Sequence, residues 1–210
     1  MNLQTTLNTH PIEKLAEKHL LMIKSFSCIE SPEALVALNA KQRRRVLLHS
    51  REMDDFLHDE AFAEQEFGTN TTHLLISDDD TEIIAYISLC ADAIPLEFQE
   101  REEEGMNYST SPALKIARLA VATNYHSMGI GKQMVRYATY IAHTMTQQCG
   151  IVFLTLDCYK HRVKFYEHLG FKRNQIQTVQ RNYDSPISMR ANLNALANRL
   201  FDLNNENFNS

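Results

Sequence analysis

Residues 113–156 carry the pattern that most restricts the fold. Ala113 to Val121 is a nearly continuous apolar run, and Ile151 to Leu156 is a second one, as expected of two buried strands. Between them, a short loop containing Gly129-Ile130-Gly131 leads into a predicted helix of about Lys132 to Gln147. A strand, loop, helix and strand in this order are typical of a βαβ unit, and short apolar runs suit parallel strands. The pattern therefore predicts an α/β fold.

The N-terminal third of the chain is predicted to be helical. Starting signals such as Pro11 and Ser31-Pro32, together with apolar residues at helical spacing, predict three helices. They cover about Pro11 to Ile23, Pro32 to Leu48 and Glu52 to Phe67. We expect this part to elaborate one domain that spans residues 1–210.

Shorter elements follow on both sides of the βαβ unit. The runs Thr72 to Ser77 and Glu82 to Cys90, joined by three aspartates, predict a hairpin. The remaining predicted elements are an acidic helix or loop (Leu96 to Glu104), a helix ended by Gly170 (Val163 to Leu169), a last strand (Ile187 to Met189), a last helix (Leu193 to Leu203) and a frayed tail (residues 204–210).

The net charge of −5 hides an uneven distribution. Residues 52–104 hold 17 Asp and Glu against one Arg, whereas residues 105–210 carry a net charge of +7. We therefore expect the basic part of the chain to bind an anion and the acidic part to bind a cation. No apolar run approaches a membrane span, the first ten residues are too polar for a secretory signal, and the four cysteines lie far apart. We therefore expect a cytoplasmic protein with no membrane segment and no disulfide framework.

The glycine loop predicts an anion site, with a simple chain reversal as the alternative. Glycine lets backbone amides approach a ligand, and a helix start presents unpaired N–H groups to phosphate. The better-known phosphate loops do not fit, because Gln133 stands where a Walker motif needs Ser or Thr and Met134 where the dinucleotide motif needs glycine.

Three blocks in this order resemble the GNAT superfamily of N-acetyltransferases. They are Leu119-Ala120-Val121, then residues 125–131 (YHSMGIG), then residues 165–171 (FYEHLGF). The resemblance is best from about Thr72 to Phe171. It implies a GNAT fold, an α/β architecture with a mixed central sheet whose neighbouring parallel strands splay apart and are flanked by helices. It also implies acetyl-CoA as the cosubstrate.

The resemblance also assigns site residues. The pantetheine arm would lie along the first buried strand, and the pyrophosphate would bind the loop amides. The implied cofactor-binding residues are Leu119, Ala120, Val121, His126, Ser127, Met128, Gly129, Ile130, Gly131 and Lys132. His126 departs from the usual Arg or Gln, which suggests a weaker or more pH-sensitive affinity for CoA.

Tyr166 matches the tyrosine that many family members place near the CoA sulfur. Its predicted role is catalytic, as the proton donor to the departing thiolate, and packing in an aromatic core is the alternative. No general base is assigned. Asp157 and the glutamates of residues 97–104 stay open, with the latter as a wall that attracts a cationic acceptor or as mere surface. Cys158 is expected to be an inert thiol, and the histidine spacing gives no support for a metal site.

These observations predict an acetyl-CoA-dependent N-acetyltransferase that acts on an amine. A small-molecule or peptide amine, cationic in view of the acidic segment, ranks above nucleic acid as the partner, because the acidic part would repel RNA. Two alternatives stay open: a catalytically weak CoA-binding sensor, and a toxin-like enzyme that acetylates aminoacyl-tRNA. A homodimer is also left open.

Overall fold

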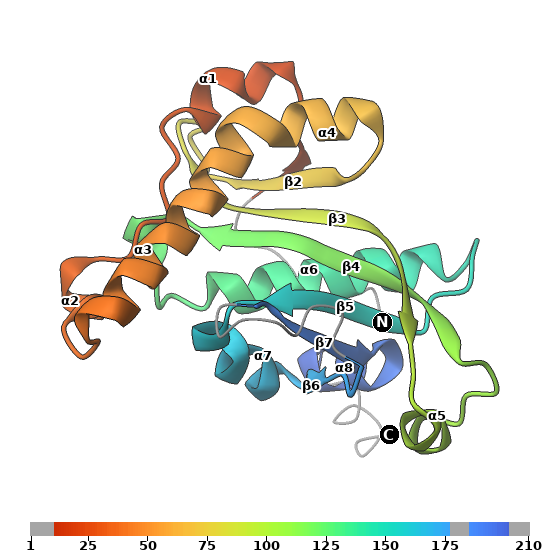
Figure 1. The fold of residues 1–210 in the computed structure, drawn as a ribbon. Coiled ribbons are helices and arrows are strands. Elements are labelled where there is room, and N and C mark those ends of the chain that lie inside the picture. Colours follow the sequence, from red (N-terminus) through yellow and green to blue (C-terminus); the bar gives the residue numbers. More distant parts are fainter. Residues whose placement is uncertain (1–10, 177–184, 202–210) are drawn as a thin grey trace, which may run out of the picture. The chain divides into compact units, whose positions relative to one another are not determined.

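A computed structural model describes residues 11–176 and 185–201 (Figure 1). The chain divides into two compact units. In the described residues, the N-terminal unit comprises residues 11–89 and 117–134, and the C-terminal unit comprises residues 90–116, 135–176 and 185–201. The expected frayed tail lies outside the described residues. The prediction of one domain over the whole chain stays a prediction.

The predicted mixed sheet is confirmed. Seven strands follow the order β1-β2-β3-β4-β5-β7-β6. Their bounds are β1 Ile12–Lys14, β2 Thr71–Ile76, β3 Ile83–Pro95, β4 Thr110–Val121, β5 Phe153–Cys158, β6 Lys172–Arg173 and β7 Ile187–Asn192. β4 and β5 pair in parallel, as the two apolar runs predict, from Ala113 opposite Phe153 to Ile116 opposite Leu156. β1 with β2, β2 with β3, and β7 with both β5 and β6 pair antiparallel.

The N-terminal unit contains the helices that lie between β1 and β2 in the chain. They are η2 (Glu17–His19), α1 (Leu20–Ile23), α2 (Pro32–Leu35), α3 (Ala40–Asp55), η3 (Phe56–Glu60) and α4 (Ala61–Phe67). A core of buried side chains, Tyr86 and Leu57 among them, joins β2 and β3 to these helices. Tyr86 packs edge to face on Phe26 and donates its hydroxyl hydrogen to the Met53 carbonyl at 2.7 Å. Phe26 and the end of α3 are thus fixed onto β3.

All three predicted helices of this unit are wrong in their bounds, the third because its predicted start at Glu52 lies inside α3. The start of the predicted helix at Pro11 is the strand β1, because Ile12 pairs with Leu75 and the Ile76 amide donates to the Pro11 carbonyl. The predicted helix of Pro32 to Leu48 is two helices. Asn39 caps the Gln42 amide and starts α3, which then runs without a break through the point where we predicted an end.

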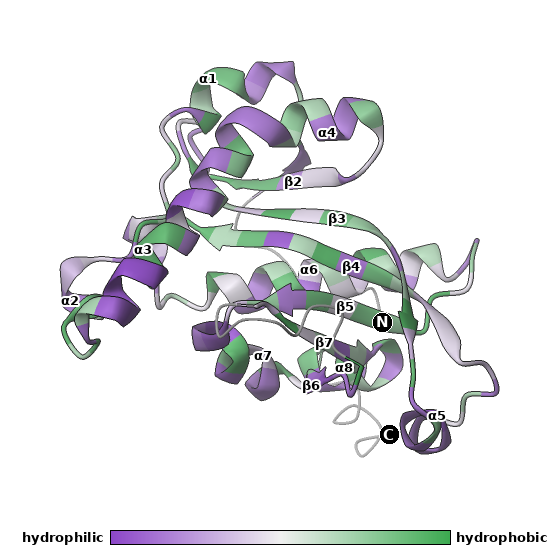
Figure 2. Ribbon diagram, viewed as in Figure 1, coloured by the Kyte–Doolittle hydropathy of each residue, from purple (hydrophilic) through white to green (hydrophobic). Residues whose placement is uncertain are grey.

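The C-terminal unit is closed by short helices whose ends agree with the sequence. α5 (Phe98–Glu104) ends at Gly105 and α7 (Val163–Leu169) ends at Gly170, both with positive φ. The unit also contains η5 (Lys160–Arg162), α8 (Leu193–Phe201) and most of α6 (Ile130–Met145). Hydropathy follows this layout: α5 is almost entirely hydrophilic, whereas β5 is largely apolar (Figure 2).

Candidate functional site

The predicted cofactor-binding residues form one continuous segment of the N-terminal unit. Leu119, Ala120 and Val121 end β4, the short helix η4 (Thr123–Tyr125) follows, and α6 begins at Ile130. Between η4 and α6 the backbone turns through two left-handed residues, Ser127 with φ of 63° and Gly129 with φ of 81°. Ser127, Met128 and Gly129 are exposed. An exposed loop that enters the start of a sixteen-residue helix has the chemistry of an anion site.

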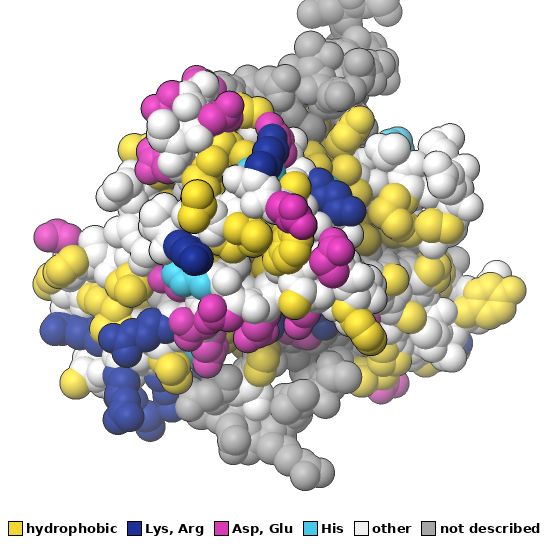
Figure 3. All heavy atoms as spheres, turned by 90° about the horizontal axis from the view of Figure 1, so that it is seen from above, with side chains coloured by type: hydrophobic (Ala, Val, Ile, Leu, Met, Phe, Trp, Pro, Cys, Tyr) yellow, Lys and Arg dark blue, Asp and Glu magenta, His cyan; other side chains and the backbone are white. Residues whose placement is uncertain are grey.

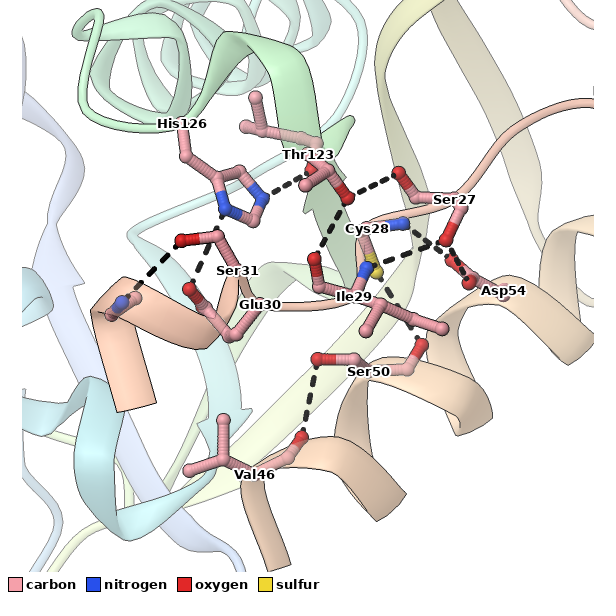
Figure 4. Close-up of polar contacts among 12 residues, drawn as sticks. Ser27, Cys28, Ile29, Glu30, Ser31, Val46, Ser50, Asp54, Thr123 and His126 are labelled. Atoms are coloured by element: carbon pink, nitrogen blue, oxygen red, sulfur yellow. Dashed lines mark hydrogen bonds and ion pairs between the residues drawn. The ribbon is translucent and has the colours of Figure 1, made fainter. Parts of the chain in front are cut away.

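The His126 ring has partners other than the loop itself. Its Nε2 lies 2.8 Å from the Val121 carbonyl oxygen, and its Nδ1 lies 3.5 Å from a Glu30 carboxylate oxygen (Figure 4). We predicted that His126 belongs to the cofactor-binding loop, and this stays a prediction. In the structure its ring links the end of β4 to residues 27–31.

A segment that sequence reasoning missed lies against the loop. Residues 27–31 connect α1 to α2, and Thr123 of η4 holds them. The Thr123 amide donates to the Ser27 carbonyl at 2.9 Å, and its hydroxyl donates to the carbonyls of Ser27 at 3.0 Å and Ile29 at 2.8 Å (Figure 4). No sequence pattern predicts this contact, because Thr123 and Ser27 are separated by 95 intervening residues.

Asp54 of α3 fixes the same segment from the other side. This carboxylate is buried and accepts a hydrogen bond from the Cys28 amide at 2.8 Å and from the Ser27 hydroxyl at 2.9 Å. The Cys28 thiol in turn donates to the Ser50 carbonyl of α3. Residues 27–31 therefore link α3 to the predicted cofactor loop through hydrogen bonds.

Tyr166 lies in the C-terminal unit, on α7. Its ring is buried and packs edge to face on Phe165 at 4.9 Å and on Phe171 at 5.6 Å. Burial raises the pKa of the phenol well above its usual value of about 10, and the neighbouring Cys158 raises it further. A buried phenol of this kind keeps its proton at every pH near neutrality, so it can act as a hydrogen-bond or proton donor but not as a base.

Asp157, which we left open as a base, has a cationic partner. Its carboxylate lies 2.6 Å from the Lys115 ammonium, and about a third of each side chain is exposed. Burial alone would lower the pKa of Lys115, but the hydrogen bond that its ammonium donates to Asp157 reverses this and raises it. Asp157 is thus engaged in an ion pair across β4 and β5. Next to it, Cys158 is buried, and burial raises the pKa of its thiol to about 12, which agrees with the expected inert thiol.

The acidic segment does not present all its carboxylates to solvent. Glu100 is 1 % exposed and accepts a hydrogen bond from Arg190 of β7, which is itself buried. Glu104 lies 3.8 Å from the same guanidinium and accepts a hydrogen bond from Asn192. Two of the five glutamates at residues 97–104 therefore anchor α5 to β7. Glu97, Glu102 and Glu103 are exposed, and they alone stay available for the predicted acceptor wall.

The described residues contain neither a group of metal ligands nor a membrane-spanning helix. In residues 11–176 and 185–201, no three His, Cys, Asp or Glu side chains are grouped in a way that could hold a metal ion. No helix within these residues combines the length and the apolar character needed to cross a membrane.

Comparison with known proteins identifies the family. Residues 70–173 match the family model described as an acetyltransferase (GNAT) domain. Similar solved structures include a tyrosine-to-phenylalanine variant of KacT, 18% identical, with a TM-score of 0.66 over 90% of this chain and 98% of that chain. AtaT complexed with acetyl-methionyl-tRNAfMet is 17% identical, with a TM-score of 0.62 over 85% of this chain and 94% of that one.

A third similar structure contains the cosubstrate. It is a variant of the AtaT toxin bound to the C-terminus of the antitoxin AtaR and to acetyl-CoA. It is 16% identical, with a TM-score of 0.64 over 92% of this chain and 99% of that chain. At identities of 16–18%, these similarities show a shared fold.

Proposed function

We propose that this chain, which belongs to the GNAT acetyltransferases, transfers the acetyl group of acetyl-CoA to the amino group of an aminoacyl-tRNA. The family model supports acetyl transfer. The acceptor is the finer part of the proposal and is argued below from charge and fold.

The loop of the N-terminal unit is the proposed site for the pyrophosphate of acetyl-CoA. Backbone amides at the loop and the start of α6 would donate to the phosphates, with Lys132 as a nearby exposed cation. Leu119 and Val121, partly exposed at the end of β4, would contact the pantetheine arm. This assignment follows the resemblance in the three sequence blocks.

Acetyl transfer to an amine needs few ionisable side chains. A neutral amine attacks the thioester carbonyl, a carbon–nitrogen bond forms and the carbon–sulfur bond breaks, the nitrogen releases one proton to water, and the departing thiolate takes up a proton. Tyr166 is the proposed donor on the basis of the resemblance: its buried phenol carries a proton at neutral pH, and its raised pKa makes it a weaker acid than a free phenol. No side chain is proposed as the base: Asp157 is paired with Lys115, and an amine that arrives neutral, or that loses its proton to water, needs none.

The structure weakens the argument for a cationic acceptor. That argument depended on the acidic residues before β4, of which Glu100 is buried and Glu104 is bonded to Arg190 and Asn192. The single positive charge of Arg190 balances one of these two carboxylates, so the charge that would repel RNA from this segment is smaller by one than the sequence indicates.

A cationic stripe on α3 favours RNA instead. Lys41, Arg44 and Arg51 are exposed and lie away from the buried residues of this helix, and the last turn also exposes Glu52 and Asp55. Lys and Arg side chains gather at one edge of the molecular surface, over the first turns of α3 (Figure 3). Arg43, also on α3, stabilises the start of this helix, because its guanidinium donates hydrogen bonds to the carbonyls of Leu38 and Val36. A stripe of exposed cations suits a phosphate backbone.

Fold similarity points in the same direction. AtaT, whose structure with acetyl-methionyl-tRNAfMet matches most of this chain, supports an aminoacyl-tRNA acceptor for a chain of this shape. We propose a cytoplasmic location, as expected from four cysteines that lie far apart in the sequence.

A panel of acceptors tests the proposal. Purified protein is mixed with acetyl-CoA and aminoacyl-tRNAs, polyamines or peptides, and the released CoA thiol is measured. We expect release with one or more aminoacyl-tRNAs and none with the uncharged tRNA. Release only with a polyamine or a peptide would contradict the acceptor but keep the enzyme. Tight binding of acetyl-CoA without release from any acceptor would favour the CoA-binding sensor.

A further inference from the structure

We propose that Glu30 is a positioning residue for the acetyl-CoA loop and acts on it through His126. The inference rests on the proposed function, because it concerns the same loop. It adds a residue outside the three sequence blocks, in residues 27–31, that sets how strongly the loop binds its ligand.

The contacts of the His126 ring define the arrangement. Nε2 lies 2.8 Å from the Val121 carbonyl oxygen, which can only accept, so this nitrogen carries a hydrogen. Nδ1 lies 3.5 Å from a Glu30 carboxylate oxygen. Only the doubly protonated ring is complementary to both oxygens. Glu30 therefore favours an imidazolium ion that stays on the Val121 carbonyl.

The surroundings hold Glu30 in place. The residue before it is fixed through the Ile29 carbonyl, which accepts from the Thr123 hydroxyl, and Ser31 after it caps α2 by accepting from the Ala34 amide. The side chains of Glu30 and His126 are only 12% and 23% exposed. Because the residues on both sides of Glu30 are held by hydrogen bonds and its carboxylate is largely shielded from solvent, Glu30 can orient the His126 ring.

The loop has a reason to need such support. Ser127, directly after His126, has a φ of 63°, which costs energy for a residue with a side chain. The hydrogen bond between the His126 ring and the Val121 carbonyl holds the residue before this turn at the end of β4. Without this hydrogen bond the turn can relax, and the loop amides must then be ordered again when the ligand binds.

Charge and position predict opposite signs for the loss of Glu30. CoA is a polyanion, so removal of a carboxylate near its loop would strengthen binding if charge alone mattered. If Glu30 acts by positioning His126, the same substitution weakens binding. The sign of the change therefore separates the two explanations.

The experiment measures the dissociation constants of CoA and acetyl-CoA by calorimetry for the full chain and four variants. These are Glu30→Gln, His126→Gln, the double variant, and Glu33→Gln as the matched control. Glu33 is an exposed glutamate three residues away, and its substitution removes the same charge. We expect Glu30→Gln to weaken CoA binding about fivefold to tenfold, as for the loss of one partly buried charged contact. Glu33→Gln is expected to leave binding unchanged or slightly stronger.

The double variant completes the test. In the His126→Gln background, Glu30→Gln should no longer weaken CoA binding, because the His126 ring through which Glu30 acts on the loop is absent. A second readout does not need the ligand: the ¹⁵N shifts of the His126 ring in the free protein at pH 6.5 should report two protonated nitrogens, and a neutral ring in Glu30→Gln.

Three results would overturn the inference. They are unchanged or stronger CoA binding in Glu30→Gln, an equal loss in both His126 backgrounds, and a neutral His126 ring in the unsubstituted protein. Failure of the proposed function is seen separately, as absence of CoA binding by the unsubstituted chain while the ring signature of His126 is still observed.

Discussion

The environment of Tyr166 decides what a phenol can do in this protein. Its burial against Phe165 and Phe171 keeps the proton on the oxygen. We expect Tyr166→Phe to lower turnover about 100-fold or more, the size typical of a lost acid, while the dissociation constant of acetyl-CoA changes little. Steady-state kinetics and calorimetry check this, with the melting temperature as the control for packing. Unchanged turnover would leave Tyr166 with a purely structural role.

His73 on β2 makes folding stability depend on pH. Burial, with a smaller effect of Lys14, lowers its pKa from 6.5 to about 4. In this window the unfolded chain binds the proton more strongly than the folded protein, so stability is fully present above about pH 6.5 and is lost as the pH falls toward 4. The loss at pH 4.5 is expected to be about 2–3 kcal/mol.

Urea unfolding at pH 7.5 and pH 4.5 measures this loss. The variant His73→Gln should lose less stability between the two pH values than the unsubstituted protein does. His168→Gln, at an exposed histidine, is the control and should keep the full dependence on pH. Equal pH dependence in His73→Gln would show that another group is responsible.

Sequence reasoning and structure differ most clearly at His126. The block around the glycines shows where the loop lies, and the structure does have left-handed backbone at Gly129 there. Where the His126 ring points was beyond prediction, because its partner Glu30 lies 95 intervening residues away in a segment without periodicity. Local patterns report backbone shape, whereas side-chain partners depend on which segments the fold brings together.

Among the elements, α5 shows how a charged helix is fixed to a sheet. Arg190 of β7 is buried with Glu100, so Arg190→Met leaves a buried carboxylate without its cation. We expect a loss of about 3–5 kcal/mol in the free energy of unfolding. The matched control is Arg173→Met, which breaks the more exposed pair with Glu167 and should cost less than about 1 kcal/mol. Similar losses in the two variants would contradict the assignment.

Elements with their own end signals were predictable. α5 and α7 end at Gly105 and Gly170, and β4 and β5 follow apolar runs that only buried strands explain. The first residues were not predictable, because Ile12 has helical spacing in the sequence but finds hydrogen-bond partners on the edge of β2. A three-residue strand carries no pattern of its own, so tertiary pairing decides its structure.

For the whole molecule, the uneven charge distribution acquires a different meaning. The sequence predicts a cationic acceptor, whereas our proposal is an aminoacyl-tRNA, supported by the exposed stripe of Lys41, Arg44 and Arg51. If the stripe contacts phosphates, the double variant Lys41→Gln/Arg44→Gln should bind tRNA more weakly. The slope of log K against log salt should then become shallower by about 1.5–2, because each lost phosphate contact releases roughly one counterion fewer.

Filter binding of aminoacyl-tRNA between low and moderate salt measures this slope. The control removes two exposed lysines of the C-terminal unit, Lys164→Gln/Lys172→Gln, and carries the same change in net charge. If both double variants alter the slope equally, net charge rather than the α3 stripe governs RNA binding. If only the α3 variant does so, a helix that sequence reasoning treated as an elaboration of the fold is the surface that contacts the acceptor. Asp54 near the other end of this helix is hydrogen-bonded to Ser27 and Cys28, and Ser27 is in turn bonded to Thr123, just before the loop proposed for acetyl-CoA.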